Sequence, residues 1–178
     1  MRIKRASVQE KTTKYYRAKR VGSESYKEGD AFITKIYYDD KKNSVKERTK
    51  VIGSHKEVNH FTSNGVFAKS ENFLNDKRHG IETKYAISKA NASVKSTKTY
   101  AEGRLHGESI TYDLNDKVIK QELFALGKLV LKYLRKEGDT NEIAGVEIID
   151  MENLQKLPTA ELEKLQAHRK ENPEWFKA

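Results

Sequence analysis

Cysteine is absent from this sequence of 178 residues. Its absence excludes disulfide frameworks, thiol catalysis and zinc sites built on cysteine. Hydrophobic residues are also few, at 36%, whereas a compact globular domain has about 45–50% with glycine counted. No apolar run approaches the roughly 18 residues that a membrane-spanning helix needs, and the basic start of the chain lacks the apolar stretch of a secretory signal. We therefore expect a cytoplasmic protein with a thin core and no membrane span.

Motifs for catalysis are missing as well. The sequence has no Gly-x-Ser-x-Gly nucleophile motif and no glycine-rich loop for phosphate. His55 and His60 flank Glu57, but no third and fourth metal ligand follows at a defined spacing. The prediction is a protein that is not an enzyme and has no cofactor and no metal site.

Charge divides the chain into three segments, although its net value is +9. Residues 1–20 carry eight basic side chains and only one acid, Glu10. Residues 21–133 hold 20 basic and 15 acidic residues, and residues 134–178 hold ten acids against seven basic residues. We interpret these segments as a basic N-terminal arm, a central repeat region, and an acidic connector with a C-terminal helix and tail.

Internal repeats are the most informative feature of the central region. Residues 61–73 align with residues 112–124 without a gap, and residues 73–85 align with residues 100–112. The first alignment matches Asn64 with Asn115, Lys69 with Lys120, and Glu71 with Glu122, and the second matches His79-Gly80 with His106-Gly107. The aromatic residue that closes the unit of roughly 24 residues recurs at Tyr37, Phe61, Tyr85 and Tyr112. A period of this length is typical of a repeat architecture.

Each unit has the pattern of a β-hairpin. Residues 107–112 and 117–124 alternate in polarity, and Asn-Gly and Asn-Asp pairs at positions 64–65 and 115–116 are strong hairpin-turn signals. Gly80 and Gly107 are expected to hold backbone positions that need a positive φ or a close approach. A single hairpin buries little, so neighbouring hairpins must supply the core. The predicted fold is all-β: an elongated antiparallel sheet of hairpin repeats with a C-terminal capping α-helix.

The segment from Tyr100 through Gly103 and His106-Gly107 to Tyr112 resembles the MORN (membrane occupation and recognition nexus) repeat. It is most similar to a bacterial variant that is often described as an antitoxin component. The resemblance covers residues 26–129. It implies a twisted antiparallel sheet that serves as a binding or assembly scaffold, or an antitoxin- or immunity-type inhibitor of a toxic enzyme.

The acidic C-terminal segment predicts a polar connector over residues 135–141, a short strand at 146–149, and a turn that Asp150 caps. Thr159 is the expected N-cap of a helix over residues 160–171. A narrow leucine stripe runs through the turn and the helix and consists of Leu154, Leu157, Leu162 and Leu165. Two interpretations stay open: the helix hides the last open edge of the sheet, or the tail docks onto another protein.

Candidate binding residues fall into three groups. The predicted protein-binding residues of the sheet face are Tyr85, Tyr100, Tyr112 and Phe124, which are either an exposed surface or a stacked core. The tail adds Trp175 and Phe176. The arm interleaves cations with aromatic rings, as surfaces for nucleic acid or an acidic partner do, at Lys14, Tyr15, Tyr16, Arg17, Lys19 and Arg20.

The predicted function is therefore a non-enzymatic protein-binding scaffold or inhibitor. The first alternative is a nucleic-acid-binding protein that uses residues 1–20. A sheet that ends in an open edge can also associate with itself.

Overall fold

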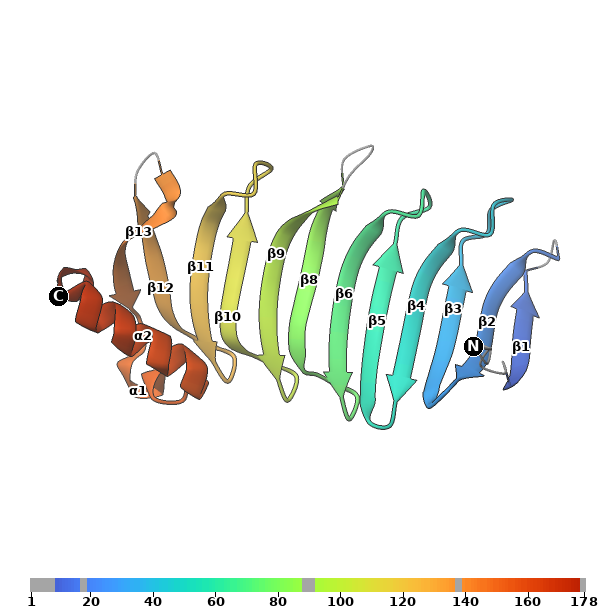
Figure 1. The fold of residues 1–178 in the computed structure, drawn as a ribbon, viewed down its shortest axis with the longest axis horizontal. Coiled ribbons are helices and arrows are strands. Elements are labelled where there is room, and N and C mark those ends of the chain that lie inside the picture. The colour runs from blue at the N-terminus through green and yellow to red at the C-terminus, as the bar shows by residue number, and fades with distance from the viewer. Residues whose placement is uncertain (1–8, 17–18, 88–91, 137–138, 177–178) are drawn as a thin grey trace, which may run out of the picture. The chain divides into compact units, whose positions relative to one another are not determined.

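A computed structural model describes residues 9–16, 19–87, 92–136 and 139–176. It contains thirteen strands of an open antiparallel sheet, followed by two α-helices and a short 3₁₀ helix (Figure 1). The predicted all-β hairpin-repeat fold with a C-terminal helix is confirmed. The chain divides into two compact units: unit 1 comprises residues 1–76 and 87–92, and unit 2 comprises residues 77–86 and 93–178.

Unit 1 consists of strands that pair antiparallel in chain order. They are β1 (Gln9–Tyr15), β2 (Val21–Glu28), β3 (Ala31–Tyr37), β4 (Val45–Ile52), β5 (His55–Phe61) and β6 (Phe67–Leu74). Part of the segment expected to be a basic arm is thus the first strand of the sheet.

Unit 2 holds the remaining strands and the helices. The strands are β7 (Lys77–Arg78), β8 (Gly80–Ile87), β9 (Ala92–Ala101), β10 (Arg104–Tyr112), β11 (Val118–Ala125), β12 (Lys128–Lys136) and β13 (Asp139–Ile148). The helices are α1 (Met151–Leu154), α2 (Thr159–Glu171) and the 3₁₀ helix η1 (Pro173–Phe176). No helix in the described part of the chain is both long and apolar enough to cross a membrane.

Tight turns connect the strands at one end of each hairpin. Their backbones adopt positive φ at Gly29, Gly53, Gly103 and Gly127. Successive turns are joined by backbone hydrogen bonds, and in unit 2 the Gly103 N–H donates to the Arg78 carbonyl (2.9 Å) and the Gly127 N–H donates to the Leu105 carbonyl (2.7 Å). This recurring bond fixes the spacing of one hairpin against the next.

Longer loops connect the strands at the other end. In the two loops that the sequence predicts as hairpin turns, a polar side chain accepts hydrogen bonds from backbone N–H groups of the loop. The carboxylate of Asp113 accepts from the N–H groups of Asn115 (2.8 Å) and Lys117 (2.9 Å). Thr62 does the same for the Val66 N–H with its hydroxyl oxygen (3.1 Å). These loops contain the Asn-Asp and Asn-Gly pairs, so both predicted hairpin turns are confirmed.

The hydrophobic core of unit 2 lies between one face of β11 to β13 and helix α2, which crosses that face in Figure 1. Its buried members are Leu123, Ala125, Val130, Leu131, Tyr133, Leu157 and Leu165. The predicted leucine stripe packs here, because Leu154 and Leu162 lie partly buried against this cluster. A register shift between Leu123 and Phe124 lets the consecutive residues Val130 and Leu131 both enter the core.

The structure differs from the sequence prediction at the C-terminal segment in three respects. Strands β12 and β13 occupy most of the segment expected to be a connector, since β12 runs to Lys136 and β13 begins at Asp139. Thr159 is not the N-cap of α2: Pro158 holds that position without a side-chain bond, and its carbonyl accepts from the N–H groups of Glu161 and Leu162. The helix also covers a face of the sheet rather than its edge. By contrast, Asp150 does cap α1, through a bond from the Asn153 N–H (3.1 Å).

Candidate binding surfaces

One face of unit 1 carries a row of three apolar side chains and two lysines that runs across five strands. Side chains of residues directly opposite one another on neighbouring strands lie on the same face. The register therefore brings five side chains side by side, and we call them the apolar stripe: Lys27, Phe32, Val51, Lys56 and Phe73. Phe32 is 51% exposed although it lies within a strand. The sequence alone does not predict this row, because only the register brings Phe32, Val51 and Phe73 side by side.

Cations cover some of the aromatic rings at this level of the strands. In unit 1 the Lys56 ammonium lies 4.6 Å from the centre of the Phe73 ring and 2.8 Å from the Asp76 carboxylate. In unit 2 the Arg78 guanidinium lies 5.3 Å from the Tyr100 ring centre and donates to the Tyr100 hydroxyl (3.4 Å). Phe73 and Tyr100 occupy the same position in the repeat. The ring of Tyr100 is thus partly occupied by a contact within its own unit.

The four predicted sheet-face aromatics are all half-buried, and they do not share one face. Phe124 is directly opposite Leu129, and alternation along β11 puts Phe124 on the face away from buried Leu123. Ile110 is the cross-strand partner of Gln121, which shares with Leu123 the face that α2 covers. Tyr112 lies two residues after Ile110 on β10 and therefore lies on that face as well. Arg78 contacts both Glu82 and Tyr100, so these two side chains share a face. Tyr85 lies three residues after Glu82 on β8, and alternation along the strand puts it on the other face.

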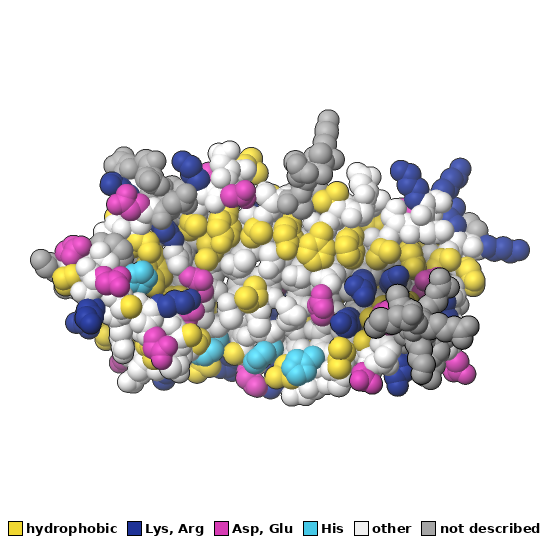
Figure 2. Space-filling view, viewed as in Figure 1, with side chains coloured by type: hydrophobic (Ala, Val, Ile, Leu, Met, Phe, Trp, Pro, Cys, Tyr) yellow, Lys and Arg dark blue, Asp and Glu magenta, His cyan; other side chains and the backbone are white. Residues whose placement is uncertain are grey.

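A band of hydrophobic side chains lies near the strand ends that lead into the longer loops (Figure 2). Tyr37, Phe61 and Tyr112 end their strands there. The Phe61 and Phe67 ring centres lie 5.4 Å apart, and the Tyr38 hydroxyl donates to the Phe61 carbonyl (2.8 Å). The hydroxyl of Tyr38, the residue after the repeated aromatic Tyr37, thus links the loop after β3 to the end of β5.

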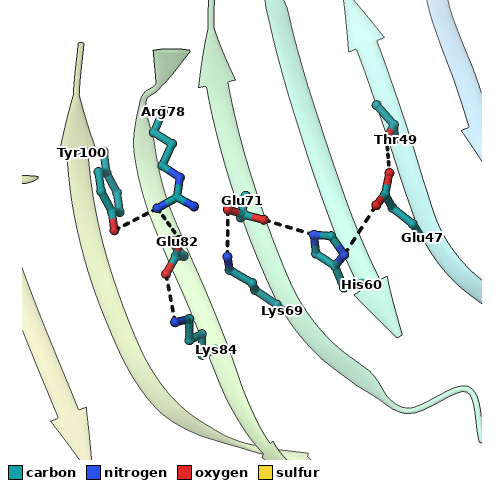
Figure 3. A network of polar contacts seen from close by, with 9 residues as sticks. All are labelled: Glu47, Thr49, His60, Lys69, Glu71, Arg78, Glu82, Lys84 and Tyr100. Carbon is teal, nitrogen blue, oxygen red and sulfur yellow. Dashed lines mark hydrogen bonds and ion pairs between the residues drawn. The ribbon is translucent and has the colours of Figure 1, made fainter. Parts of the chain in front are cut away.

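A polar network lies on the stripe-bearing face of unit 1 (Figure 3). Its central group is the carboxylate of Glu71, a residue that is only 8% exposed. The Lys69 ammonium approaches it to 2.8 Å and His60 Nε2 to 3.0 Å, while His60 Nδ1 lies 3.7 Å from Glu47. The imidazole thus lies between two carboxylates on neighbouring strands.

Unit 2 repeats the lysine–glutamate pair of this network. Lys120 lies 2.8 Å from Glu122, which is buried. This pair matches Lys69 and Glu71 in the sequence alignment, so the repeat conserves the ion pair within the chain. A second buried glutamate, Glu82, lies 3.4 Å from Arg78 (Figure 3). Buried carboxylates of this kind are stable only when they are paired.

We expect replacement of His60 by alanine to lower the free energy of unfolding by about 1–2 kcal/mol, because the buried Glu71 loses a charge-assisted partner. Denaturant unfolding followed by far-UV circular dichroism measures this loss. His79→Ala is the matched control, because His79 is exposed and its loss should change stability by about 0.5 kcal/mol at most. Equal effects of the two substitutions would show that the His60 contacts contribute nothing.

The structure describes five of the six predicted arm residues, and Arg17 lies outside the described residues. Two of the five make contacts within unit 1: the Tyr16 hydroxyl donates to the Tyr37 carbonyl (2.7 Å), and Arg20 pairs with Asp39 (2.6 Å). Lys14, Tyr15 and Lys19 are exposed. Among the six predicted residues, these three are the described side chains that remain accessible to a partner.

The C-terminal groove of unit 2 surrounds the end of β13. Its lining consists of Leu134, Val146, Glu147, Ile148, Ile149, Met151 and Phe176, around a volume of about 490 Å³. Leu134, Ile149 and Met151 are exposed, whereas the predicted tail residue Phe176 packs partly against the core. The side chain of Trp175, the other predicted tail residue, lies outside the described residues.

Polar side chains border helix α2 where it meets the sheet. Gln121 donates to the Glu108 carboxylate (2.6 Å) and accepts from Arg135. Burial raises the pKa of Tyr133 to about 12 and lowers the pKa of Arg135. Gln121 thus bridges Glu108 and Arg135 next to the helix, so we assign these groups to helix packing. Within the described residues, no group of three or more histidine, cysteine, aspartate or glutamate side chains could hold a metal ion.

Comparison with known proteins gives no family. No model of a protein family matches the sequence. No curated protein matches it either. A crystal structure of an S. aureus TarM mutant in complex with Fondaparinux, alpha-GlcNAc-glycerol and UDP is similar over 55% of this chain and 19% of that chain, with a TM-score of 0.39 and 16% identity. The pneumococcal O-GlcNAc transferase GtfA in complex with UDP and GlcNAc gives a TM-score of 0.25 and 10% identity, over 89% of this chain and 23% of that chain. The chain spans less than a quarter of the length of these proteins, and similarity this low carries no argument about function.

Proposed function

We propose that this protein is a non-enzymatic protein-binding scaffold or inhibitor, and that unit 1 binds its partner through the apolar stripe. The observation that carries the proposal is the exposure of Phe32 within a row of cross-strand neighbours. Contiguous exposed apolar area, such as Phe32 provides next to Val51, is typical of an interaction site. The proposal includes inhibition of a toxic enzyme, because an inhibitor needs the same kind of surface.

The chemistry of the stripe defines the partner. Phe32 and Val51 offer apolar area at its centre, and the ammonium groups of Lys27 and Lys56 flank them. Lys56 already has a carboxylate partner, whereas no ion pair is recorded for Lys27 among the described residues. A protein segment with apolar side chains next to acidic ones complements this row.

Replacement of Phe32 by glutamate should abolish partner capture by the tagged full-length protein, with a loss of at least about tenfold in affinity. The measurement is an affinity pull-down from native lysate at two salt concentrations, with and without nuclease. The introduced carboxylate both removes the apolar contact and repels acidic groups of the partner.

Ile52→Glu is the matched control. Ile52 is 45% exposed on the opposite face of β4, next to Val51 in sequence, so the same charge change there should leave capture intact. Loss of the partner in both variants would contradict the proposed surface. Recovery of nucleic acid alone, released by nuclease or high salt, would contradict the proposed function and favour nucleic-acid binding.

A further inference from the structure

Two strands form the ends of the strand order among the described residues, and each has a single neighbour. β1 pairs with β2, and β13 pairs with β12. Each therefore presents unpaired backbone N–H and C=O groups along its outer side, which is a template for a strand of another chain.

The edge at β13 is only partly protected against pairing with another strand. It is ten residues long, contains the small residues Ala144 and Gly145, and has no proline. The C-terminal groove surrounds it with the exposed apolar side chains of Leu134, Ile149 and Met151. Register shifts interrupt its pairing with β12 on either side of Arg135, and such bulges are one protective feature of natural edge strands. The length of β13 and the exposed apolar side chains beside it still leave an edge with which a strand of another chain can pair.

The two edges carry opposite charges. Among the described side chains, the exposed charged residues of β1 are Glu10, Lys11 and Lys14, and Lys11 pairs with Glu24 (2.6 Å), whereas those of β13 are Glu142 and Glu147. Both glutamates also approach lysines of β12, at 3.1 and 3.9 Å. Exposed pairs of this kind are worth little, so the acidic edge can still attract a second cation.

We propose that the occupant of the β13 edge is β1 of a second copy of this chain. The copies associate head to tail, and the strands form one further antiparallel pair. Charge favours this arrangement, because two β13 edges would bring Glu142 and Glu147 of both copies together, and two β1 edges would bring lysines together. The contact uses neither Phe32 nor its stripe, so it is independent of the proposed function.

Such a contact is heterologous, because different surfaces of the two copies meet. Each added copy leaves one β1 and one β13 free, so assembly can continue from copy to copy. Light scattering on the full chain should therefore give a molar mass that rises with protein concentration. The mass should fall with added salt, which screens the charges of the exposed edges. A monomeric mass at all concentrations would overturn the proposal.

The absence of cysteine allows the contact to be mapped with single introduced thiols. Thr12 on β1 and Ala144 on β13 are exposed, so Thr12→Cys and Ala144→Cys serve as probes with a short thiol-specific cross-linker. We expect a cross-linked product when the two variants are mixed, and little from either variant alone. Ser63→Cys, in an exposed loop of unit 1, is the control partner for Ala144→Cys. A product from Ala144→Cys alone would overturn the head-to-tail arrangement in favour of a tail-to-tail dimer.

Charge reversal on β1 gives a second test. Lys14→Glu should weaken association by about 2–5-fold, the range of an exposed ion pair. Lys41→Glu, the same change at an exposed turn of unit 1, should leave it unchanged. Equal effects would show that net charge rather than the β1 edge controls association. Because capture through the apolar stripe is measured with Phe32→Glu, failure of one proposal leaves the other standing.

Discussion

Replacement of Leu131 by alanine should lower the free energy of unfolding of unit 2 by about 2–5 kcal/mol, the largest effect that we expect from any single substitution. Leu131 is fully buried between cross-strand neighbours Leu123 and Ile148, beneath helix α2. Its truncation removes apolar contacts and leaves a cavity that the register of three strands prevents from collapsing. Denaturant unfolding followed by the fluorescence of the single tryptophan, which lies in unit 2, measures the loss.

Leu114→Ala is the control for this experiment. Leu114 lies in the loop between β10 and β11 and is 84% exposed, so its truncation should change stability by about 0.5 kcal/mol at most. If Leu131→Ala were no more costly than Leu114→Ala, helix α2 would not form the core of unit 2 as described.

Replacement of Gly107 by alanine should cost about 1–3 kcal/mol, through backbone strain rather than a clash. Gly107 has a φ of +105°, and an added Cβ would lie 3.4 Å from Thr99 and 3.6 Å from Pro158, which is ordinary contact. An L-residue is disfavoured at this φ, which lies well beyond the left-handed well near +57°. Thermal unfolding of the variant measures the cost.

Gly53→Ala provides the matched control for the backbone term. Gly53 has a φ of +57°, and an added Cβ would meet nothing within 4 Å. Alanine there should lower the free energy of unfolding only by the cost of the left-handed helical conformation, about 1–2 kcal/mol. A cost at Gly107 smaller than that at Gly53 would contradict the strain assigned to the His-Gly position of the repeat.

The repeat alignment predicted the parts of the structure that depend on local sequence. The pairs Lys69–Glu71 and Lys120–Glu122 were aligned as equivalent residues, and both are ion pairs of 2.8 Å. Gly107, which was expected to need a positive φ or a close approach, has a positive φ. These features were predictable because a few neighbouring residues determine the type of turn, and because the period of the repeat is visible in the sequence itself.

The assignment of side chains to faces could not be predicted from the sequence. Register shifts occur between Leu105 and Ser109 and between Thr111 and Tyr112. Each shift changes the offset between paired residues of neighbouring strands, so the sequence positions of Tyr100 and Tyr112 cannot show that these residues face opposite ways. The apolar stripe could not be predicted for a related reason. Its members lie far apart in sequence, and only cross-strand pairing brings them together.

The succession of strand pairs within each unit has a consequence for the folding reaction. Every pair recorded in unit 1 joins strands that are adjacent in the chain, so no long loop must close before a contact forms. The contact order is low for an all-β protein, and folding can begin at any hairpin and spread outwards. The same arrangement makes the hairpin a module: duplication or loss of one copy lengthens or shortens the sheet without altering the path of the rest of the chain.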